Sequence, residues 1–251
     1  MQLDGKPNIQ TILENYLTDF NIREFKAHLS TSISSQIRQN LKSNHNRGFV
    51  IGSSLMRWCL SDNPRRVSTN QELEPLNTDI DIFLGHKVNK DLLLYLDSTH
   101  KTVNCGYGIS VYDRTIEHIN RPLFTKTSIV ADLVLSPSLS YQRLSEKLTR
   151  KYVIDYIDRS FDVSFNDWYY DISNNKISVG PNFVFTLITG MYKHEKPKGS
   201  NFKQTPERLE KRKGKINDML STSSSFKDFG IVPTCLDAKT YSETILDFYN
   251  Q

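Results

Sequence analysis

The 251-residue chain has few cysteines, and no two of them are close together in sequence. Cys59, Cys105 and Cys235 are an odd number, too widely separated for a disulfide framework or for the paired spacing of a zinc site. The six histidines are also scattered singly, and none stands at metal-ligand spacing from another histidine or from a cysteine. These absences argue against a zinc hydrolase and a disulfide-rich secreted protein, and they favour reduced thiols in a cytoplasm.

Long apolar runs are also missing. The longest one, residues 183–192, is interrupted by threonine and glycine and is too short to span a bilayer. The first fifteen residues contain Asp4, Lys6 and Glu14 and no apolar segment, so we expect no secretory signal. The sequence therefore predicts a cytoplasmic protein without a membrane partner.

Two common catalytic motifs are absent as well. No Gly-x-x-x-x-Gly-Lys-Ser/Thr motif occurs, which argues against a P-loop for ATP. Ser53 lacks the Gly-x-Ser-x-Gly context of a hydrolase nucleophile, and Cys59 follows Trp58 in an apolar segment, as expected of a buried thiol. Phe, Tyr and Trp make up 11% of the residues, however, so a packed core is available although only 37% of the residues are hydrophobic.

Positive charge is concentrated near the C-terminal end. The formal net charge is only +4, but residues 190–215 contain nine lysines and arginines against three glutamates. Such a stretch is typical either of a surface that contacts nucleic-acid phosphates, here 193–215, or of an ordinary solvated helix. Charge alone leaves both interpretations open.

The periodicity of apolar residues predicts an α/β (α+β) fold with a mixed sheet. We expect an N-terminal helical segment over 1–46, a core over 47–180 and a C-terminal helical lobe over 181–251. The expected helices are 8–44, one carrying Leu55 to Leu60, 91–96, 140–151, 181–193, 205–220 and 237–249. The expected strands are 47–52, 79–84, 103–112, 128–135, 160–166 and 177–179, and residues 61–75 read as a loop.

A Gly-Ser pair follows the first expected strand. Gly52 allows a phosphate to approach the backbone closely, and Ser53 or Ser54 can cap the helix that follows. The unpaired N–H groups at the start of that helix then favour an anion. The pattern predicts nucleotide-phosphate contacts at Gly52, Ser53 and Ser54.

Carboxylates occur on the next expected strand, in the run Asp79-Ile80-Asp81. Side chains two positions apart on a strand point to the same face, so this pair can share two magnesium ions. A third carboxylate from a neighbouring strand would complete the metal site or take the proton of an attacking hydroxyl. Asp162, in the alternating run SFDVSFN, is preferred for that role, and Asp132, in the apolar run SIVADLVL, is the alternative.

This ordered set resembles the polymerase-β-type nucleotidyltransferase superfamily over residues 47–179. The strand around Asp162 is similar to that of the poly(A) polymerase branch, residues 161–171 look like segments of viral and phage members, and Asp132 resembles the third carboxylate of the minimal branch. Compared with compact members, the sequence carries an inserted loop, 61–75, between the Gly-Ser pair and the first aspartate.

The resemblance implies a role for each matching residue. Gly52 and Ser53 would hold the β- and γ-phosphates of an NTP donor. Asp79, Asp81 and Asp162 would bind Mg²⁺ or Mn²⁺, with Asp162 near the acceptor hydroxyl. Lys193, or basic residues within 211–215, would touch the triphosphate or the acceptor.

The expected activity is transfer of a nucleoside monophosphate from an NTP to an acceptor hydroxyl, with release of pyrophosphate. RNA, a protein or a small molecule can supply that hydroxyl. The alternative is a catalytically inactive member of the fold that binds nucleic acid or a protein through 193–215. The aromatic residues 168–170 are expected to pack in the core rather than to stack a base.

Overall fold

The computed structural model describes residues 19–33, 35–42, 48–60, 80–84, 90–105, 108–113, 129–134, 146–195 and 205–250. In the first part of the chain its elements are α2 (Asp19–Ser32), α3 (Ser35–Lys42), β1 (Phe49–Ile51), α4 (Ser54–Leu60), β2 (Asp81–Phe83), α6 (Lys90–Thr99), β3 (His100–Cys105), β4 (Gly108–Asp113) and β5 (Ile129–Val134). The later elements are α7 (Glu146–Ser160), the 3₁₀ turn η3 (Ser164–Asn166), β6 (Trp168–Asp171), β7 (Lys176–Val179), α8 (Pro181–Thr189), β8 (Met191–Lys193), α9 (Pro206–Ser221), α10 (Ser224–Asp228), β9 (Thr234–Leu236) and α11 (Ala238–Asn250).

The described strands β1 to β7 form a mixed seven-stranded sheet in the order β3-β4-β5-β2-β1-β6-β7, and β8 and β9 form a separate two-stranded sheet. β2 and β5 are parallel, and the other described neighbours in the seven-stranded sheet are antiparallel. The expected mixed α/β fold is therefore present. In the described part of the chain, no helix combines the length and the apolarity that a bilayer crossing requires.

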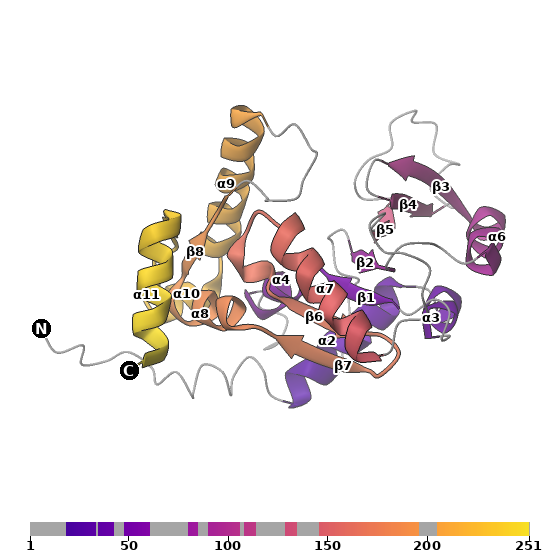
Figure 1. The fold of residues 1–251 in the computed structure, drawn as a ribbon, viewed down its shortest axis with the longest axis horizontal. Coiled ribbons are helices and arrows are strands. Elements are labelled where there is room, and N and C mark those ends of the chain that lie inside the picture. The colour runs from indigo at the N-terminus through magenta and orange to yellow at the C-terminus, as the bar shows by residue number, and fades with distance from the viewer. Residues whose placement is uncertain are drawn as a thin grey trace, which may run out of the picture.

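Helices cover both faces of the sheet at its centre (Figure 1). Val50 in β1 packs on the side of α2, α3 and α4, whereas its neighbours Phe49 and Ile51 pack against Val153 and Ile157 of α7. Because successive side chains of a strand point to opposite faces, a short strand that is apolar throughout suits this doubly covered position. β1 and β2 lie at the centre of the sheet. Asp81 and Phe83, two positions apart on β2, point to the face of the sheet that α7 covers.

The C-terminal part of the chain follows β7 and begins with α8. Pro181 stands in its first turn, and Asp167 accepts hydrogen bonds from the backbone and side-chain N–H groups of Asn182 at 3.1 and 2.9 Å. α8 ends where Gly190, with a left-handed φ of 72°, donates its N–H to the Thr186 carbonyl. The expected helix 181–193 was therefore too long, and its last residues form β8, which pairs in parallel with β9.

Two other expected elements were wrong in kind. Residues 103–112 do not form one strand, because β3 and β4 pair as an antiparallel hairpin there. The run SFDVSFN at 160–166 is not a strand either: it contains the end of α7, an isolated bridge from Val163 to His194, and η3. Phe161, Val163 and Phe165 pack against apolar residues, but their backbone does not pair with a strand of the sheet. The strand that pairs with β1 is β6, the aromatic run that follows.

The remaining expectations agree better with the structure. β1, α4, β2, β5, β7, α9 and α11 all lie within or close to the predicted ranges. α7 begins inside the expected helix 140–151 but continues to Ser160. The predicted helical segment 8–44 contains α2 and α3, while residues 1–18, the loop 61–75 and Asp79 lie outside the described residues.

Candidate functional site

Gly52 and Asp81 meet where β1 leads into α4. The antiparallel register pairs Ile51 with Asp81, so the next residue of β1 lies beside the start of β2. Gly52 has a left-handed φ of 91°, and a Cβ added to it would lie 2.4 Å from Asp81 Oδ2. Only glycine accommodates both conditions, because any larger residue is strained there and collides with the carboxylate. The structure therefore brings these two predicted site residues into direct contact.

Trp168 fixes this turn from the other side. Its indole N–H donates to the Gly52 carbonyl at 2.5 Å, and the side chain is only 1% exposed. The ring of Phe25 from α2 packs edge-on against it, with the ring centroids 5.8 Å apart. The expected core packing of Trp168 is thus present. Its polar contact with Gly52, 116 residues earlier, is a long-range feature that no local sequence pattern signals.

The two serines after Gly52 have different surroundings. Ser53 is partly buried, while Ser54 is buried and its Oγ has no hydrogen-bond partner in the described part of the chain. One turn later Arg57 is exposed, whereas the other residues of α4 are buried. Its Nε lies 3.4 Å from Ser53 Oγ, a long hydrogen bond. Sequence reasoning missed Arg57, although a basic residue four positions after Ser53 on a helix is a usable signal.

Tyr156 of α7 lies on the same face of the sheet as Asp81. Its ring packs on Phe83, with the centroids 4.7 Å apart. Burial raises the pKa of Tyr156; a hydrogen bond with Ser160 lowers this pKa, and the negative charge of Asp81 raises it further. The phenol is therefore protonated at neutral pH, and it lies near enough to Asp81 for the carboxylate charge to act on it. Sequence reasoning did not select this residue.

Position 132 is the direct neighbour of position 81 across the sheet. β2 and β5 run parallel, and their register pairs Asp81 with Asp132. Neighbouring strands are about 4.8 Å apart, so the two backbones are close enough for carboxylates there to share ions. This adjacency favours Asp132, the alternative in the sequence analysis, as the third carboxylate.

Asp162 is engaged elsewhere. Its Oδ2 is 2.9 Å from Arg212 Nε and 3.3 Å from His194 Nε2, and its backbone carbonyl accepts the N–H of Glu195 at 2.8 Å. Binding a metal through this oxygen would disturb a charge-assisted hydrogen bond. Its Oδ1 is buried and has no hydrogen-bond partner among the described residues, but no described contact joins Asp162 to Asp81, so its role as third carboxylate stays a prediction.

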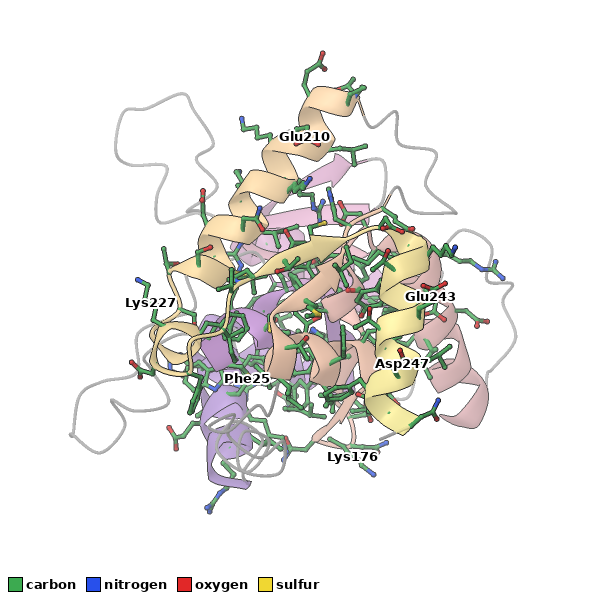
Figure 2. All side chains as sticks on the ribbon, turned by 90° about the vertical axis from the view of Figure 1, so that its left-hand side faces the viewer. Phe25, Lys176, Glu210, Lys227, Glu243 and Asp247 are labelled. Atoms are coloured by element: carbon green, nitrogen blue, oxygen red, sulfur yellow. The ribbon has the colours of Figure 1, made fainter. Side chains whose placement is uncertain are left out.

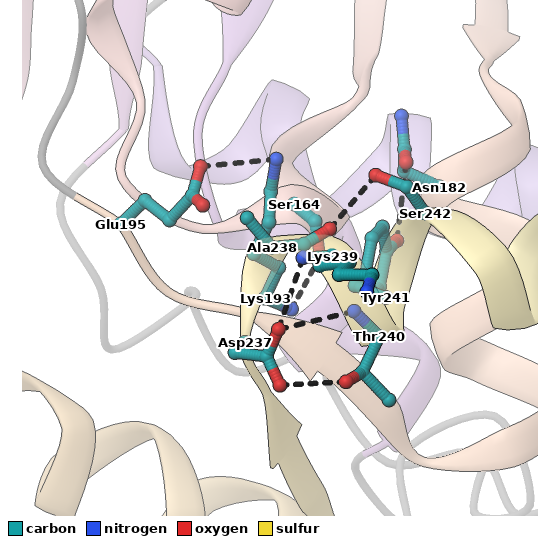
Figure 3. A network of polar contacts seen from close by, with 10 residues as sticks. All are labelled: Ser164, Asn182, Lys193, Glu195, Asp237, Ala238, Lys239, Thr240, Tyr241 and Ser242. Carbon is teal, nitrogen blue, oxygen red and sulfur yellow. Dashed lines mark hydrogen bonds and ion pairs between the residues drawn. The ribbon is translucent and has the colours of Figure 1, made fainter.

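Lys193 lies in a third environment, shown in Figure 3. Its Nζ is 3.1 Å from Glu195 Oε2 and 5.7 Å from the centre of the Tyr241 ring on α11. Tyr192, whose side chain alternates to the other side of β8, donates to Asn217 Oδ1 of α9 at 2.6 Å. Lys193 is therefore held toward α11, and no described contact links it to Gly52 or Asp81.

The thiol of Cys59 is not activated as a nucleophile. Burial raises the pKa of Cys59 to about 12, which keeps this thiol protonated, as its position in an apolar helix predicted. Within the described ranges no three His, Cys, Asp or Glu side chains are grouped to hold a metal ion. Asp79 lies outside those ranges, and Asp81 supplies the hard oxygen donors that Mg²⁺ prefers.

Comparisons with protein-family models, with curated proteins and with solved structures gave no match. The chemistry of the site therefore has to be inferred from its residues. These are a carboxylate against a glycine turn, a serine and an arginine on the adjoining helix, a tyrosine on the covering helix, and an aspartate position on the neighbouring strand.

Replacing Gly52 by alanine tests the packing of this turn. We expect the free energy of unfolding to fall by about 1–3 kcal/mol, because alanine is strained at a φ of 91° and its Cβ meets Asp81 Oδ2. Gly214→Ala is the matched control. Nothing lies within 4 Å of the added Cβ on α9, so helix propensity should stabilise that variant by about 0.5–1 kcal/mol. Urea unfolding measures both, and equal stability of the Gly52→Ala and parent chains would contradict the arrangement.

Proposed function

We propose that this protein is a metal-dependent nucleotidyltransferase with a polymerase-β-type site, which moves a nucleoside monophosphate from an NTP to an acceptor hydroxyl and releases pyrophosphate. The observation that carries the proposal is the contact of Gly52, at the β1–α4 turn, with Asp81 at the start of β2. A glycine turn at the start of α4 and a carboxylate able to hold a cation are then adjacent, as transfer from a metal-bound triphosphate requires.

The metal ligands in this proposal are Asp79, Asp81 and a third carboxylate. The register partner of Asp81 is Asp132, which we favour, and Asp162 is the alternative. All supply hard anionic oxygens, which suit Mg²⁺ or Mn²⁺. When bound, these ions would neutralise the triphosphate and polarise its phosphoryl oxygens. The chain itself would position the phosphates and accept the proton of the attacking hydroxyl on a carboxylate.

The triphosphate would be held by the turn and by α4. Because Gly52 has no side chain, the Asp81 carboxylate can pack directly against the turn there. The Ser53 hydroxyl lies next to the Arg57 guanidinium, which adds a positive charge on the exposed side of α4. Arg57 thereby takes the role that the sequence resemblance gave to Lys193, which is paired with Glu195.

The alternative of a non-catalytic binding module has less support. Its working surface would be the basic stretch 193–215, but Lys193 of that stretch is paired with Glu195. The exposed side of α9 also carries Glu207 and Glu210, so its charge is mixed (Figure 2). A transferase that binds its acceptor partly through this helix remains compatible with the same residues.

Label transfer tests the proposal. The chain is incubated with each α-labelled NTP at about 1 mM, a concentration at or above typical KM values, with Mg²⁺ and with single-stranded RNA as acceptor or with the chain alone. We expect pyrophosphate release with one or more NTPs, and label in the RNA, in the protein or in a co-purified small molecule. Absence of pyrophosphate release, together with absence of Mg²⁺-dependent nucleotide binding, would overturn the proposal.

A further inference from the structure

Asp162, His194 and Arg212 form a cluster from three distant segments, at the ends of α7 and β8 and in the middle of α9. The side chains of Asp162 and His194 are 2% and 6% exposed, whereas that of Arg212 is 42% exposed. An ionised carboxylate only accepts hydrogen bonds, so both His194 Nε2 and Arg212 Nε donate to its Oδ2. Arg212 is therefore the member of the cluster that reaches solvent.

The contact with Asp162 leaves the two Nη groups of Arg212 able to bind another group. A guanidinium has five N–H donors, and Asp162 engages the one on Nε. The structure gives the two Nη groups no partner among the described residues, and the bond at Nε restrains rotation of the group. A buried carboxylate thus restrains a planar guanidinium on a side chain that is 42% exposed, and its two Nη groups form a fork that matches two oxygens of an oxyanion.

The charges around Arg212 favour a phosphate. Four of the five residues from 211 to 215 are basic and none is acidic, whereas Glu207 and Glu210 precede them in the first turns of α9 (Figure 2 labels Glu210). Lys211 and Lys215 are exposed, and in the described part of the chain neither has a carboxylate partner. Since Asp162 neutralises only Arg212, the segment retains the positive field that a multiply charged ligand requires.

We propose that Arg212, oriented by Asp162 and His194, binds a phosphate group at the surface of the C-terminal lobe. The phosphate belongs either to a nucleotide or to the backbone of a single-stranded nucleic acid. Asp162 is then a positioning residue for Arg212 rather than a metal ligand. The inference does not depend on the proposed transfer reaction, because binding of this kind needs no divalent ion.

The experiment measures binding without divalent metal at about 0.1 M salt, where exposed charges are largely screened. The ligands are inorganic pyrophosphate and an NTP, followed by calorimetry, and a labelled single-stranded oligonucleotide, followed by fluorescence anisotropy. The variants are Arg212→Gln, Arg212→Lys and Asp162→Asn. Lys215→Gln is the matched control, because it removes the same charge from an exposed position of the same helix.

We expect Arg212→Gln to weaken binding about ten- to hundredfold, as loss of charge-assisted hydrogen bonds implies, and Lys215→Gln to weaken it by a few-fold at most. Arg212→Lys should resemble the Gln variant because lysine has no fork, and Asp162→Asn should weaken binding while Arg212 is still present. A loss confined to the oligonucleotide assigns the phosphate to a nucleic-acid backbone. A loss with pyrophosphate and NTP assigns it to a nucleotide.

A purely structural cluster gives a different result. If the pair only fastens α9 to the core, Arg212→Gln lowers the thermal midpoint but binds no more weakly than Lys215→Gln, and this overturns the proposal. The proposal is also overturned if the parent chain binds none of the three ligands: pyrophosphate, the NTP and the oligonucleotide. These assays contain no divalent metal and do not vary Asp81. A failure of the proposed transfer reaction, which depends on Mg²⁺ and Asp81, is therefore distinguishable from a failure of this proposal.

Discussion

Substituting Asp81 by asparagine is expected to abolish the Mg²⁺-dependent stabilisation of the chain by NTP. At a ligand concentration about 100 times Kd, binding to the folded state alone contributes about 2.7 kcal/mol. For a chain of this size that raises the thermal midpoint by about 5–10 °C. An amide carries no charge and is a poor ligand for Mg²⁺, so the variant should show little of this rise.

The control for this substitution is Asp247→Asn on the exposed side of α11, labelled in Figure 2. This substitution makes the same chemical change far along the chain from the Gly52 turn. The variant should therefore keep the full Mg²⁺-dependent rise of the thermal midpoint with NTP. Without metal and nucleotide, the Asp81→Asn and parent chains should both unfold cooperatively. If the Asp81 variant retained the full stabilisation, the metal assignment would be wrong.

Removing Trp168 should have the largest effect on folding. The side chain is buried, packs against Phe25 and donates to the Gly52 carbonyl. Trp168→Ala is expected to lower the free energy of unfolding by about 3–5 kcal/mol, because it leaves a large cavity and an unpaired carbonyl. That is a considerable fraction of the about 5–15 kcal/mol by which domains are stable. Urea unfolding followed by circular dichroism measures this change.

Trp168→Phe separates the two contributions of the indole. It keeps an aromatic ring in the core but removes the N–H that holds Gly52, so we expect a loss of about 1–3 kcal/mol. The variant should also bind NTP more weakly, since the turn that receives the phosphates is less fixed. Stability and nucleotide affinity both equal to those of the parent chain would show that the hydrogen bond to Gly52 does not support the turn.

The parts of the fold that the sequence predicted are those with a strong local pattern. β1 is a short apolar run that ends in glycine, and α9 and α11 carry helical periodicity with few breaks. The run SFDVSFN misled because alternation also arises when irregular backbone turns apolar side chains inward next to a 3₁₀ turn. The helix over 181–193 was predicted too long because an apolar run continues through Gly190, although a glycine there is a usual helix end.

In the candidate site, too, local motifs indicated some features, whereas others depend on contacts between distant parts of the chain. β1 and β2 are successive described strands, separated by α4, and they pair as neighbours, which brings Gly52 against Asp81. The sequence resemblance placed both residues in one site but predicted no direct contact between them. The choice between Asp132 and Asp162 depended on strand order, which no local pattern determines. β5 lies beside β2, while the buried Asp162 is paired with the partly exposed Arg212, 50 residues later. The polar contact of Trp168 with Gly52 is equally non-local.

The most direct test of the central assignment counts metal ions at the Gly52–Asp81 turn. Mn²⁺, which replaces Mg²⁺ at oxygen-rich sites, is titrated into the chain with a non-hydrolysable NTP analogue and followed by electron paramagnetic resonance. The proposed site predicts about two bound Mn²⁺ ions per parent chain and a loss of that binding in Asp81→Asn but not in Asp247→Asn. Equal Mn²⁺ binding by the parent chain and the Asp81 variant, or none by either, would contradict it.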